Sequence, residues 1–252
     1  MRRMELILDT ADAETVAKLS DSLTISGVTT NPTIITRSGK TPEEVEQQMM
    51  AVLHPGQKFF MQVIATDAKG MVTDAHAIKG LQVANGPEMC VKVPVTLEGY
   101  KAMKALVAEG ITVLATAIYS ADQGFMAALN GVQYLAPYVN RMDNYGDGVR
   151  EVGDLLRMLA QAGLPTKVCA ASFKNVRQVH ELVKDGVHAK VCAASFKNVR
   201  QVHELVKDGV HAVTVAPSVV EAMIGHAGTA VAVKEFSDAW HEAFGRDTFA
   251  AN

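Results

Sequence analysis

The sequence predicts a (β/α)8 TIM barrel, and three observations lead to that prediction. Short apolar runs alternate with longer segments of helical periodicity along almost the whole chain of 252 residues. Nearly continuous apolar strands joined by helices are typical of a parallel sheet covered on both faces. If one internal repeat is counted once, the strand-helix units number eight, as in a closed barrel. The first strand ends in LDTADAE, without the glycine-rich turn usual in an open doubly wound sheet.

Eight apolar runs supply the expected strands. They lie between segments whose apolar residues recur at helical spacing, with acidic residues early and glycine near the end. These segments include DAETVAKLSDS, PEEVEQQMMAVL, LEGYKAMKALVAEG and VREVGDLLRMLAQAG. The strands are expected, in chain order, at residues 6–10, 26–30, 58–64, 89–95, 111–118, 134–139, 167–173 and 212–216.

An additional amphipathic helix is expected after the eighth unit, at residues 228–245. Its apolar face carries Phe236 and Trp240, so it must pack on the barrel or on another subunit. No linker rich in proline, glycine or serine divides the chain. Residues 1–252 are therefore expected to form a single domain.

The seventh strand-helix unit is present twice. KVCAASFKNVRQVHELVKDGVHA occupies residues 167–189 and again residues 190–212, without a substitution. Because strand number, shear and tilt are linked in a barrel, a ninth strand would disrupt closure. We expect one copy in the wall and the other as an excursion, and the sequence does not select between the copies. A perfect duplicate, unlike the diverged repeats of solenoids, favours an engineered insertion or an error in the recorded sequence over a natural duplication.

Composition excludes several classes of protein. The formal net charge is −3 and the isoelectric point about 6.2, so no surface for nucleic acid is indicated. No run reaches the roughly 18 apolar residues of a membrane span, and the N-terminus is a poor signal peptide. Cys90, Cys169 and Cys192 lie in apolar runs and suggest no disulfide framework. A cytoplasmic protein is the expectation.

Barrel enzymes carry their active sites at the C-terminal ends of the strands. Of the polar residues there, Lys92 is the most unusual, because its strand MCVKVPV leaves it only the barrel mouth as a route to water. Burial would lower the pKa of its amine, and a neutral amine can attack a carbonyl carbon to form a Schiff base. A lysine that reaches the barrel rim, or pairs with Asp9, is equally compatible with the position alone. The strand-end candidates are Asp9, Thr29, Thr30, Asn31, Gln62, Lys92, Thr116, Tyr138, Arg141, and Ser172 or Ser195.

Widely spaced motifs resemble those of the small transaldolase/fructose-6-phosphate aldolase family. They are LDT at 8–10, GVTTNPTII at 27–35, VKVPVTLEG at 91–99, APYVNRMD at 136–143, and AASFK at 170–174 and again at 193–197. Their order and their spread over nearly the whole chain make the resemblance specific. It implies a class I aldolase barrel in which Lys92 forms the Schiff base.

Three further residues match catalytic or substrate-binding positions of that family. Asp9 matches an acid that positions substrate hydroxyls and handles protons, although capping of the first helix would also explain it. Asn31 matches an amide that hydrogen-bonds hydroxyls, and a turn asparagine before proline is compatible with the same geometry. Thr116 matches a threonine that holds a catalytic water, and it could instead satisfy backbone groups.

The residues expected to bind the substrate phosphate are also inferred from the resemblance. Arg141 resembles an arginine that binds the phosphate of the acceptor sugar, for which a planar guanidinium is suited. Surface arginines are also common. Ser172 or Ser195, each followed by a lysine two residues later, resembles the serine on the phosphate side.

Two residues separate the activities within the family. Transaldolases of this group typically have a glutamate in the third strand and a phenylalanine in the segment SPF. This chain has Gln62 and Tyr138 there, as the aldolases do. Glutamine can only orient a water, and the Tyr138 hydroxyl would complete a proton relay with Gln62 and Thr116. Alone, Tyr138 is equally an amphipathic aromatic at the barrel mouth.

The expected function is therefore Schiff-base cleavage of fructose 6-phosphate to dihydroxyacetone and glyceraldehyde 3-phosphate, and the reverse addition. Transaldolase activity, or a sugar-phosphate-binding barrel without turnover, is the alternative. No cofactor and no metal is expected, because the iminium replaces a metal Lewis acid. A metal-dependent aldolase would need a histidine cluster, and the repeat histidines lack metal-site spacing; they are His180, His188, His203 and His211. The resemblance also implies a homo-oligomer, a pentamer or a decamer, through the last helix.

Overall fold

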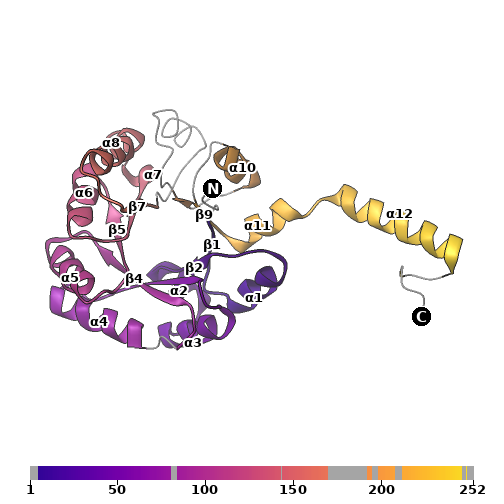
Figure 1. Ribbon diagram of the computed structural model, residues 1–252, viewed down its shortest axis with the longest axis horizontal. Coiled ribbons are helices and arrows are strands. Elements are labelled where there is room, and N and C mark those ends of the chain that lie inside the picture. Colours follow the sequence, from indigo (N-terminus) through magenta and orange to yellow (C-terminus); the bar gives the residue numbers. More distant parts are fainter. Residues whose placement is uncertain are drawn as a thin grey trace.

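The computed structural model describes residues 5–80, 84–142, 144–169, 192–194, 198–207, 212–245 and 248. These residues form a curled, all-parallel sheet with helices around its outer face (Figure 1). The strands are β1 (Glu5–Asp9), β2 (Gly27–Thr29), β3 (Lys58–Gln62), β4 (Glu88–Pro94), β5 (Val113–Ile118), β6 (Tyr134–Pro137), β7 (Lys167–Val168), β8 (Cys192–Ala194) and β9 (Ala212–Val215). The arrangement confirms the predicted barrel-type α/β fold.

The helices follow the strands in the predicted alternation. They are α1 (Ala13–Ser22), α2 (Pro32–Ser38), α3 (Pro42–Val52), α4 (Ala68–Gly80), α5 (Leu97–Ala108), α6 (Ala121–Leu129), α7 (Val139–Met142), α8 (Gly148–Gln161), α10 (Val199–Lys207), α11 (Pro217–Ile224) and α12 (Ala227–Phe244). Several of these helices begin at residues that stabilise a helix N-terminus. Thr41 and Glu44 form a capping box at the start of α3, with Pro42 as its first residue.

The start of α1 answers one question that the sequence left open. The side chain of Asp12 accepts hydrogen bonds from the backbone N–H groups of Glu14 and Thr15, so Asp12 caps this helix. Asp9 is the last residue of β1 instead. Helix capping therefore does not explain Asp9.

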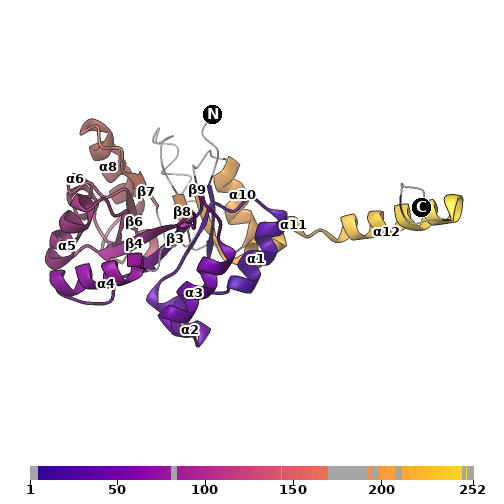
Figure 2. The ribbon, with the colours of Figure 1, turned by 60° about the horizontal axis from the view of Figure 1, so that its bottom comes forward.

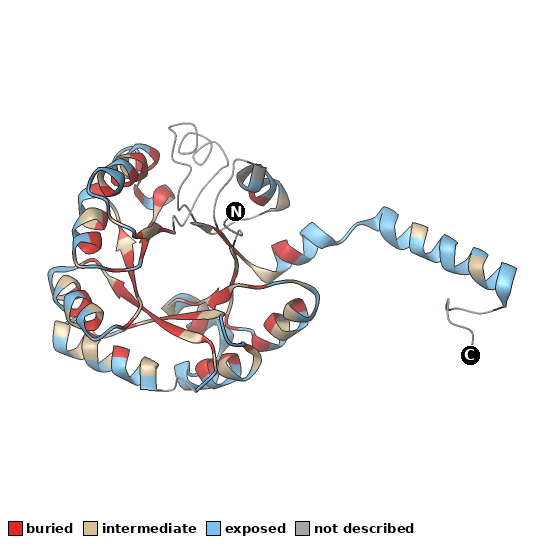
Figure 3. Ribbon diagram, viewed as in Figure 1, coloured by how far each residue is buried: buried red, intermediate tan, exposed pale blue. Residues whose placement is uncertain are grey.

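Apolar side chains fill both sides of the sheet. The larger cluster lies between strands and helices, as Figure 3 shows by the buried residues on the inner sides of the helices that surround the sheet. A smaller cluster lies inside the barrel and consists of Phe60, Cys90, Leu114, Tyr134 and Ala136. The rings of Phe60 and Tyr134 meet edge to face, 5.5 Å apart. Phe60, Leu114 and Ala136 of this cluster also line the cavity described below.

Each copy of the repeat contributes one strand to the sheet. β7, from the first copy, pairs with β6, whereas β8, from the second copy, pairs with β9. The sheet order is β7-β6-β5-β4-β3-β2-β1-β9-β8, so nine strands are described and the two copies are its outermost strands. The expectation that one copy alone supplies the wall is wrong for these strands. Each copy pairs with the strand to which the chain connects it most directly.

The last helix does not pack on the barrel. Figures 1 and 2 both show α12 extending away from the rest of the chain, and none of its residues is buried. Phe236 is 72% exposed and Phe244 58% exposed, while the Trp240 and Phe244 rings contact each other at 4.5 Å. Of the two predicted positions for this apolar face, packing on its own barrel is excluded. No helix in the described part of the chain is long and apolar enough to cross a membrane.

Candidate active site

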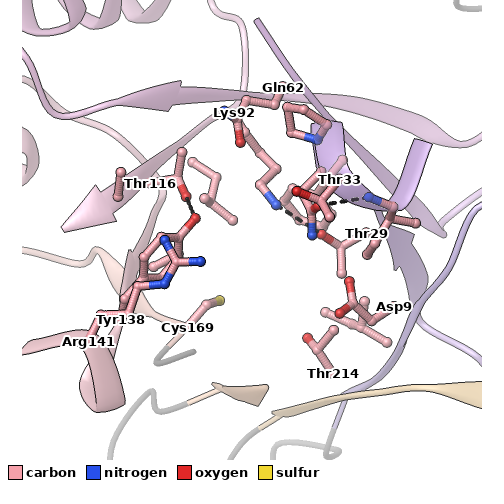
Figure 4. A pocket seen from close by; sticks show the side chains of 18 of the residues that line it. Asp9, Thr29, Thr33, Gln62, Lys92, Thr116, Tyr138, Arg141, Cys169 and Thr214 are labelled. Atoms are coloured by element: carbon pink, nitrogen blue, oxygen red, sulfur yellow. Dashed lines mark hydrogen bonds between the residues drawn. The ribbon is translucent and has the colours of Figure 1, made fainter. Parts of the chain in front are cut away.

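A cavity of about 630 Å³ opens where the strands end, as expected for a barrel enzyme. Seven of the predicted site residues line it together: Asp9, Asn31, Gln62, Lys92, Thr116, Tyr138 and Arg141. Figure 4 labels all of them except Asn31. The other two, Ser172 and Ser195, lie outside the described residues. As the strand-end rule predicts, the fold brings residues from six separate segments to one place.

Lys92 projects into this cavity from β4. It is only 8% exposed, and its Nζ donates hydrogen bonds to the Thr30 carbonyl oxygen at 2.7 Å and to Thr29 Oγ1 at 3.3 Å. Burial lowers the pKa of the amine, while the negative charge of Asp9 acts in the opposite direction. A lysine that reaches out to the rim is excluded by this burial. The arrangement favours a neutral amine, which is the nucleophilic form.

The segment after β2 holds the Lys92 amine in place. Thr30 is fully buried, and both its backbone N–H and its hydroxyl donate to the Phe60 carbonyl oxygen, at 3.0 and 2.9 Å. These two bonds fix the peptide whose carbonyl oxygen accepts from Lys92. The sequence placed Thr29 and Thr30 among the strand-end residues but gave them no role. A backbone acceptor leaves no trace in residue type, so only the structure could identify it.

Asp9 faces the same space from the end of β1. Burial raises the pKa of its carboxyl, and the nearby Lys92 charge opposes that rise. Within the described residues, no direct ion pair joins the two, so their interaction is through charge across the cavity. Asp9 is thus a partly buried acid near the amine, able to exchange protons with a bound molecule.

Asn31 caps a helix and also lines the cavity, and its predicted contact with substrate hydroxyls stays a prediction. Its Oδ1 accepts a hydrogen bond from the Ile34 N–H at 3.0 Å and so caps α2. The same residue lines the cavity. With the oxygen engaged, the amide Nδ2 is the group that can donate to a ligand hydroxyl.

Thr116 and Tyr138 form a hydroxyl pair across β5 and β6. Thr116 Oγ1 and Tyr138 Oη lie 2.9 Å apart, and Thr116 is almost fully buried. Gln62 lies opposite Lys92 in the register between β3 and β4 and also lines the cavity. Figure 4 shows Lys92 between the Thr116–Tyr138 pair on one side and Asp9 on the other. This geometry can deliver a proton near the carbon atoms of a molecule bound to Lys92.

Arg141, from α7, lies at the outer side of the same cavity. Its guanidinium stacks on the Tyr138 ring, with the central carbon 5.1 Å from the ring centre. Its Nη1 donates to the Tyr119 hydroxyl at 3.4 Å. An exposed cation held in this way suits an anionic group at the end of a ligand.

Several lining residues had no role in the sequence-based prediction. Cys169 follows the edge strand β7, and Thr214 lies in β9, which is next to the other edge strand, β8. Arg37 and Thr33 come from successive turns of α2, and Tyr119 follows β5. Thr214 could have been found by the strand-end rule, because it lies in the eighth apolar run. Among the described residues, no three His, Cys, Asp or Glu side chains are grouped as metal ligands.

Comparison with known proteins identifies the family. The family model for transaldolase/fructose-6-phosphate aldolase matches residues 6–188, which include the first copy of the repeat to its penultimate residue. The chain belongs to this family. Membership supports an enzyme of class I aldolase or transaldolase type, and it confirms the resemblance seen in the sequence motifs.

Similar solved structures agree with the fold. A proposed phosphonomutase from Burkholderia cenocepacia J2315 is 12% identical, with a TM-score of 0.51 over 93% of this chain and 94% of that chain. A proposed lyase/mutase from the same strain is 12% identical, with a TM-score of 0.52 over 100% and 88%. A variant of mandelate oxidase with a bound ligand is 13% identical, with a TM-score of 0.51 over 98% and 75%. At this identity the likeness concerns the fold alone.

Proposed function

We propose that this chain is a class I aldolase that cleaves fructose 6-phosphate into dihydroxyacetone and glyceraldehyde 3-phosphate, and that it catalyses the reverse aldol addition. The observation that carries the proposal is the environment of Lys92. Its amine is buried at the strand ends, with a lowered pKa and with two fixed oxygen acceptors. It faces a hydroxyl pair suited to proton transfer. An amine in this setting is a Schiff-base nucleophile.

The reaction begins at the ketone carbon of the sugar. Lys92 Nζ attacks this carbon, and the carbinolamine loses water to give an iminium. Removal of the proton from the C4 hydroxyl then breaks the C3–C4 bond, because the iminium accepts the electron pair and becomes an enamine. Glyceraldehyde 3-phosphate leaves. Protonation of the enamine at C3 restores the iminium, and water hydrolyses it to free dihydroxyacetone and Lys92.

The surrounding residues have separate parts in this proposal. Tyr138 and Thr116 share a hydrogen bond and carry protons to and from the C4 oxygen and C3, with a water oriented by Gln62. Asp9 and Asn31 hold the hydroxyl groups on the other side of the cavity. Arg141 binds the phosphate at the far end of the sugar. Ser172 or Ser195 adds a contact to the same phosphate.

Gln62 and Tyr138 favour the aldolase over the transaldolase. A glutamate at the first position can exchange protons through water, whereas Gln62 can only orient the water. Tyr138 supplies a hydroxyl that phenylalanine lacks, and this hydroxyl is in contact with Thr116. Efficient protonation of the enamine by such a pair releases dihydroxyacetone as the free product. In a transaldolase the enamine persists until another sugar phosphate arrives.

The exposed helix α12 supports a homo-oligomeric enzyme. Its apolar residues are exposed in the single chain, including Val231, Val233, Phe236 and Phe244. Docking of this helix on a neighbouring subunit would remove that surface from water. We propose a pentamer, or a decamer of two pentamers, in the cytoplasm.

Borohydride trapping tests the proposed chemistry. The protein is incubated with dihydroxyacetone, reduced, and analysed by intact mass. One covalent adduct is expected, and Lys92→Met should abolish it. Lys58→Met is a matched control, because Lys58 is a strand lysine at the opposite end of the barrel, beside Glu88. A wild-type protein without an adduct would contradict both the aldolase and the transaldolase, and it would leave a binding barrel without turnover.

Product analysis separates the two enzymatic activities. The aldolase forms free dihydroxyacetone from fructose 6-phosphate without an acceptor aldehyde. Gln62→Glu should shift the enzyme toward transfer to an added acceptor. If turnover requires an added acceptor, and the dihydroxyacetone unit ends in a new sugar phosphate while no free dihydroxyacetone forms, the chain is a transaldolase.

A further inference from the structure

Strand β5 contains a bulge beside the active site. In its pairing with β6, Ala115 lies opposite Leu135 and Ile118 opposite Pro137, so β5 has one residue more than β6 between these partners. Within this bulge, Ala117 has a φ of 57°. The left-handed region is strained for a residue with a Cβ atom. Strain of this kind is retained where the surrounding structure determines the conformation, often at a functional site.

The bulge changes which side chains face the cavity. Side chains of a strand alternate between its two faces. Leu114 and Thr116 line the cavity, as the alternation requires. Without the extra residue, Ile118 would come next on that face and Tyr119 would point toward the helices. Instead, Ala117 and Tyr119 line the cavity, and Ile118 is fully buried in the core between strands and helices.

The reoriented Tyr119 supports Arg141. The Tyr119 ring lies edge to face against the Tyr138 ring, 6.0 Å away, and the Tyr119 hydroxyl accepts a hydrogen bond from Arg141 at 3.4 Å. The guanidinium is thereby held between Tyr119 and the face of Tyr138. Neither contact could form if Tyr119 faced the helices.

Thr116 lies in the same bulge, but it is also held from β4, on the other side of β5. Its carbonyl oxygen accepts from the Val95 N–H at 3.0 Å, in the register of β4 with β5. This bond lies before Ala117 in the strand. A change at Ala117 should therefore act on Tyr119 and Arg141 while leaving Thr116 and Lys92 in place.

We propose that Ala117 is a positioning residue for the anion-binding end of the active site. Its left-handed backbone maintains the bulge that turns Tyr119 into the cavity, and Tyr119 in turn holds Arg141 where a substrate phosphate binds. The proposal rests on the proposed function in one respect, namely that Arg141 meets the phosphate of the acceptor. It adds a determinant of preference for phosphorylated over unphosphorylated aldehydes.

Ala117→Val tests the proposal, because a β-branched residue disfavours a positive φ. The addition of dihydroxyacetone is measured with glyceraldehyde 3-phosphate and with glyceraldehyde. We expect KM for the phosphorylated aldehyde to rise roughly tenfold, the loss of one hydrogen bond to a charged group. The ratio of kcat/KM for glyceraldehyde 3-phosphate to kcat/KM for glyceraldehyde should fall by about the same factor, and the borohydride adduct at Lys92 should still form. Inhibition by inorganic phosphate should weaken in parallel.

Asn85→Val is the matched control. Among the described residues, Asn85 is the other non-glycine with positive φ, at 62°, and it lies in the turn before β4 at the opposite end of the barrel. Both substitutions strain the backbone in the same way, so both should lower the melting temperature. Only Ala117→Val should change the preference for phosphate. Ala117→Gly, which tolerates this φ, should keep it.

Tyr119→Phe tests the same link without disturbing the backbone. It removes the hydroxyl that accepts from Arg141, and it should lower the phosphate preference by a smaller factor than Ala117→Val. A normal preference in folded Ala117→Val overturns the proposal, and so does an equal loss in Asn85→Val. If Ala117→Val does not fold, an unchanged preference in Tyr119→Phe overturns it instead. Failure of the proposed function would be evident separately, as a wild-type protein that forms no adduct.

Discussion

Two cavities share Gln62 and Pro32 as lining residues. They differ in the surroundings of a buried ionisable side chain, which is Lys92 in one cavity and Glu46 in the other. The barrel cavity contains Lys92, whose amine has two hydrogen-bond acceptors and an opposing acid. A second cavity of about 430 Å³ lies beside α2, α3 and α4 and is lined in part by Glu46 of α3. Glu46 is 4% exposed, and its Oε1 has no hydrogen-bond partner among the described residues.

The contrast shows that a perturbed pKa does not by itself indicate a catalytic group. Burial, with the charge of Glu43, raises the pKa of Glu46 to about 7. Among the described residues, no group donates a hydrogen bond to its Oε1. Asp74, another polar residue of that cavity, accepts hydrogen bonds from the backbone N–H groups of Ile64 and Ala65. Lys92 has its partners arranged around an open space, and that convergence makes a site.

The largest expected effect on turnover comes from Lys92→Met. Without the amine no iminium can form, so cleavage of fructose 6-phosphate should fall to the background rate. Glu46→Gln, at the other buried group, should leave the rate close to that of the wild type. Steady-state release of dihydroxyacetone measures both. If both variants lose the same fraction of this activity, Glu46 is needed for turnover as much as Lys92 is.

Tyr138→Phe should have the next largest effect. The ring and its stacking on Arg141 remain, but the hydroxyl that contacts Thr116 is lost. Proton transfer to the enamine should slow, and kcat for fructose 6-phosphate should fall about a hundredfold, as is usual for loss of a general acid. The borohydride adduct should still form at Lys92. A variant that loses the adduct as well would show that Tyr138 acts before proton transfer.

Asp9→Asn should change the pH dependence more than the maximal rate. In the wild type the Asp9 charge raises the pKa of Lys92 against the effect of burial, so its removal lowers that pKa further. Because the neutral amine is the reactive form, activity falls as pH drops through the Lys92 pKa. The acid limb of the kcat/KM profile should therefore move to lower pH in Asp9→Asn. Movement to higher pH would contradict the charge interaction between the two residues.

The sequence predicted most of the residues that line the candidate site, through the positions of the strand ends and through the family resemblance. Lys92 was identifiable because one cation interrupts an apolar strand, and the residues around it because parallel strands end at the same face. The sequence did not reveal two features of the site that depend on backbone conformation. The carbonyl of Thr30, which holds the amine, and the bulge at Ala117, which turns Tyr119, have no counterpart in residue type.

The sequence could not predict how the two repeat copies pair or that Glu46 is buried, because both depend on neighbouring elements. Two identical segments have identical preferences, so only their connections to β6 and β9 decide which copy pairs with which neighbour. In α3, Val45 and Met49 are buried at helical spacing, and Glu46 follows Val45 at the margin of that apolar face. Whether such a residue is covered depends on the neighbouring elements, because the helix pattern alone is compatible with an exposed carboxylate.

Glu46→Gln should have the smallest effect on turnover and a distinct effect on stability. The wild-type carboxyl is protonated in the folded chain up to about pH 7, whereas in the unfolded chain it ionises near its ordinary pKa of 4.5. Because the unfolded state then binds fewer protons, the free energy of unfolding falls as pH rises from about 4.5 to about 7. Glutamine cannot ionise, so it removes this loss and should stabilise the protein at pH 8 by roughly 2 kcal/mol relative to pH 4.

Urea denaturation of both proteins at pH 4, 6 and 8 measures the difference. The stability of Glu46→Gln relative to the wild type should rise between pH 4 and 8, and dihydroxyacetone release should remain unchanged at each pH. Glu44→Gln is a suitable control for loss of a carboxylate from the same helix, since Glu44 is an exposed residue of the capping box. A relative stability that stays flat across this range would mean that Glu46 is ionised in the folded protein. The second cavity would then contain a buried charge, as the barrel cavity does, and the contrast between the two would rest on the convergence of groups alone.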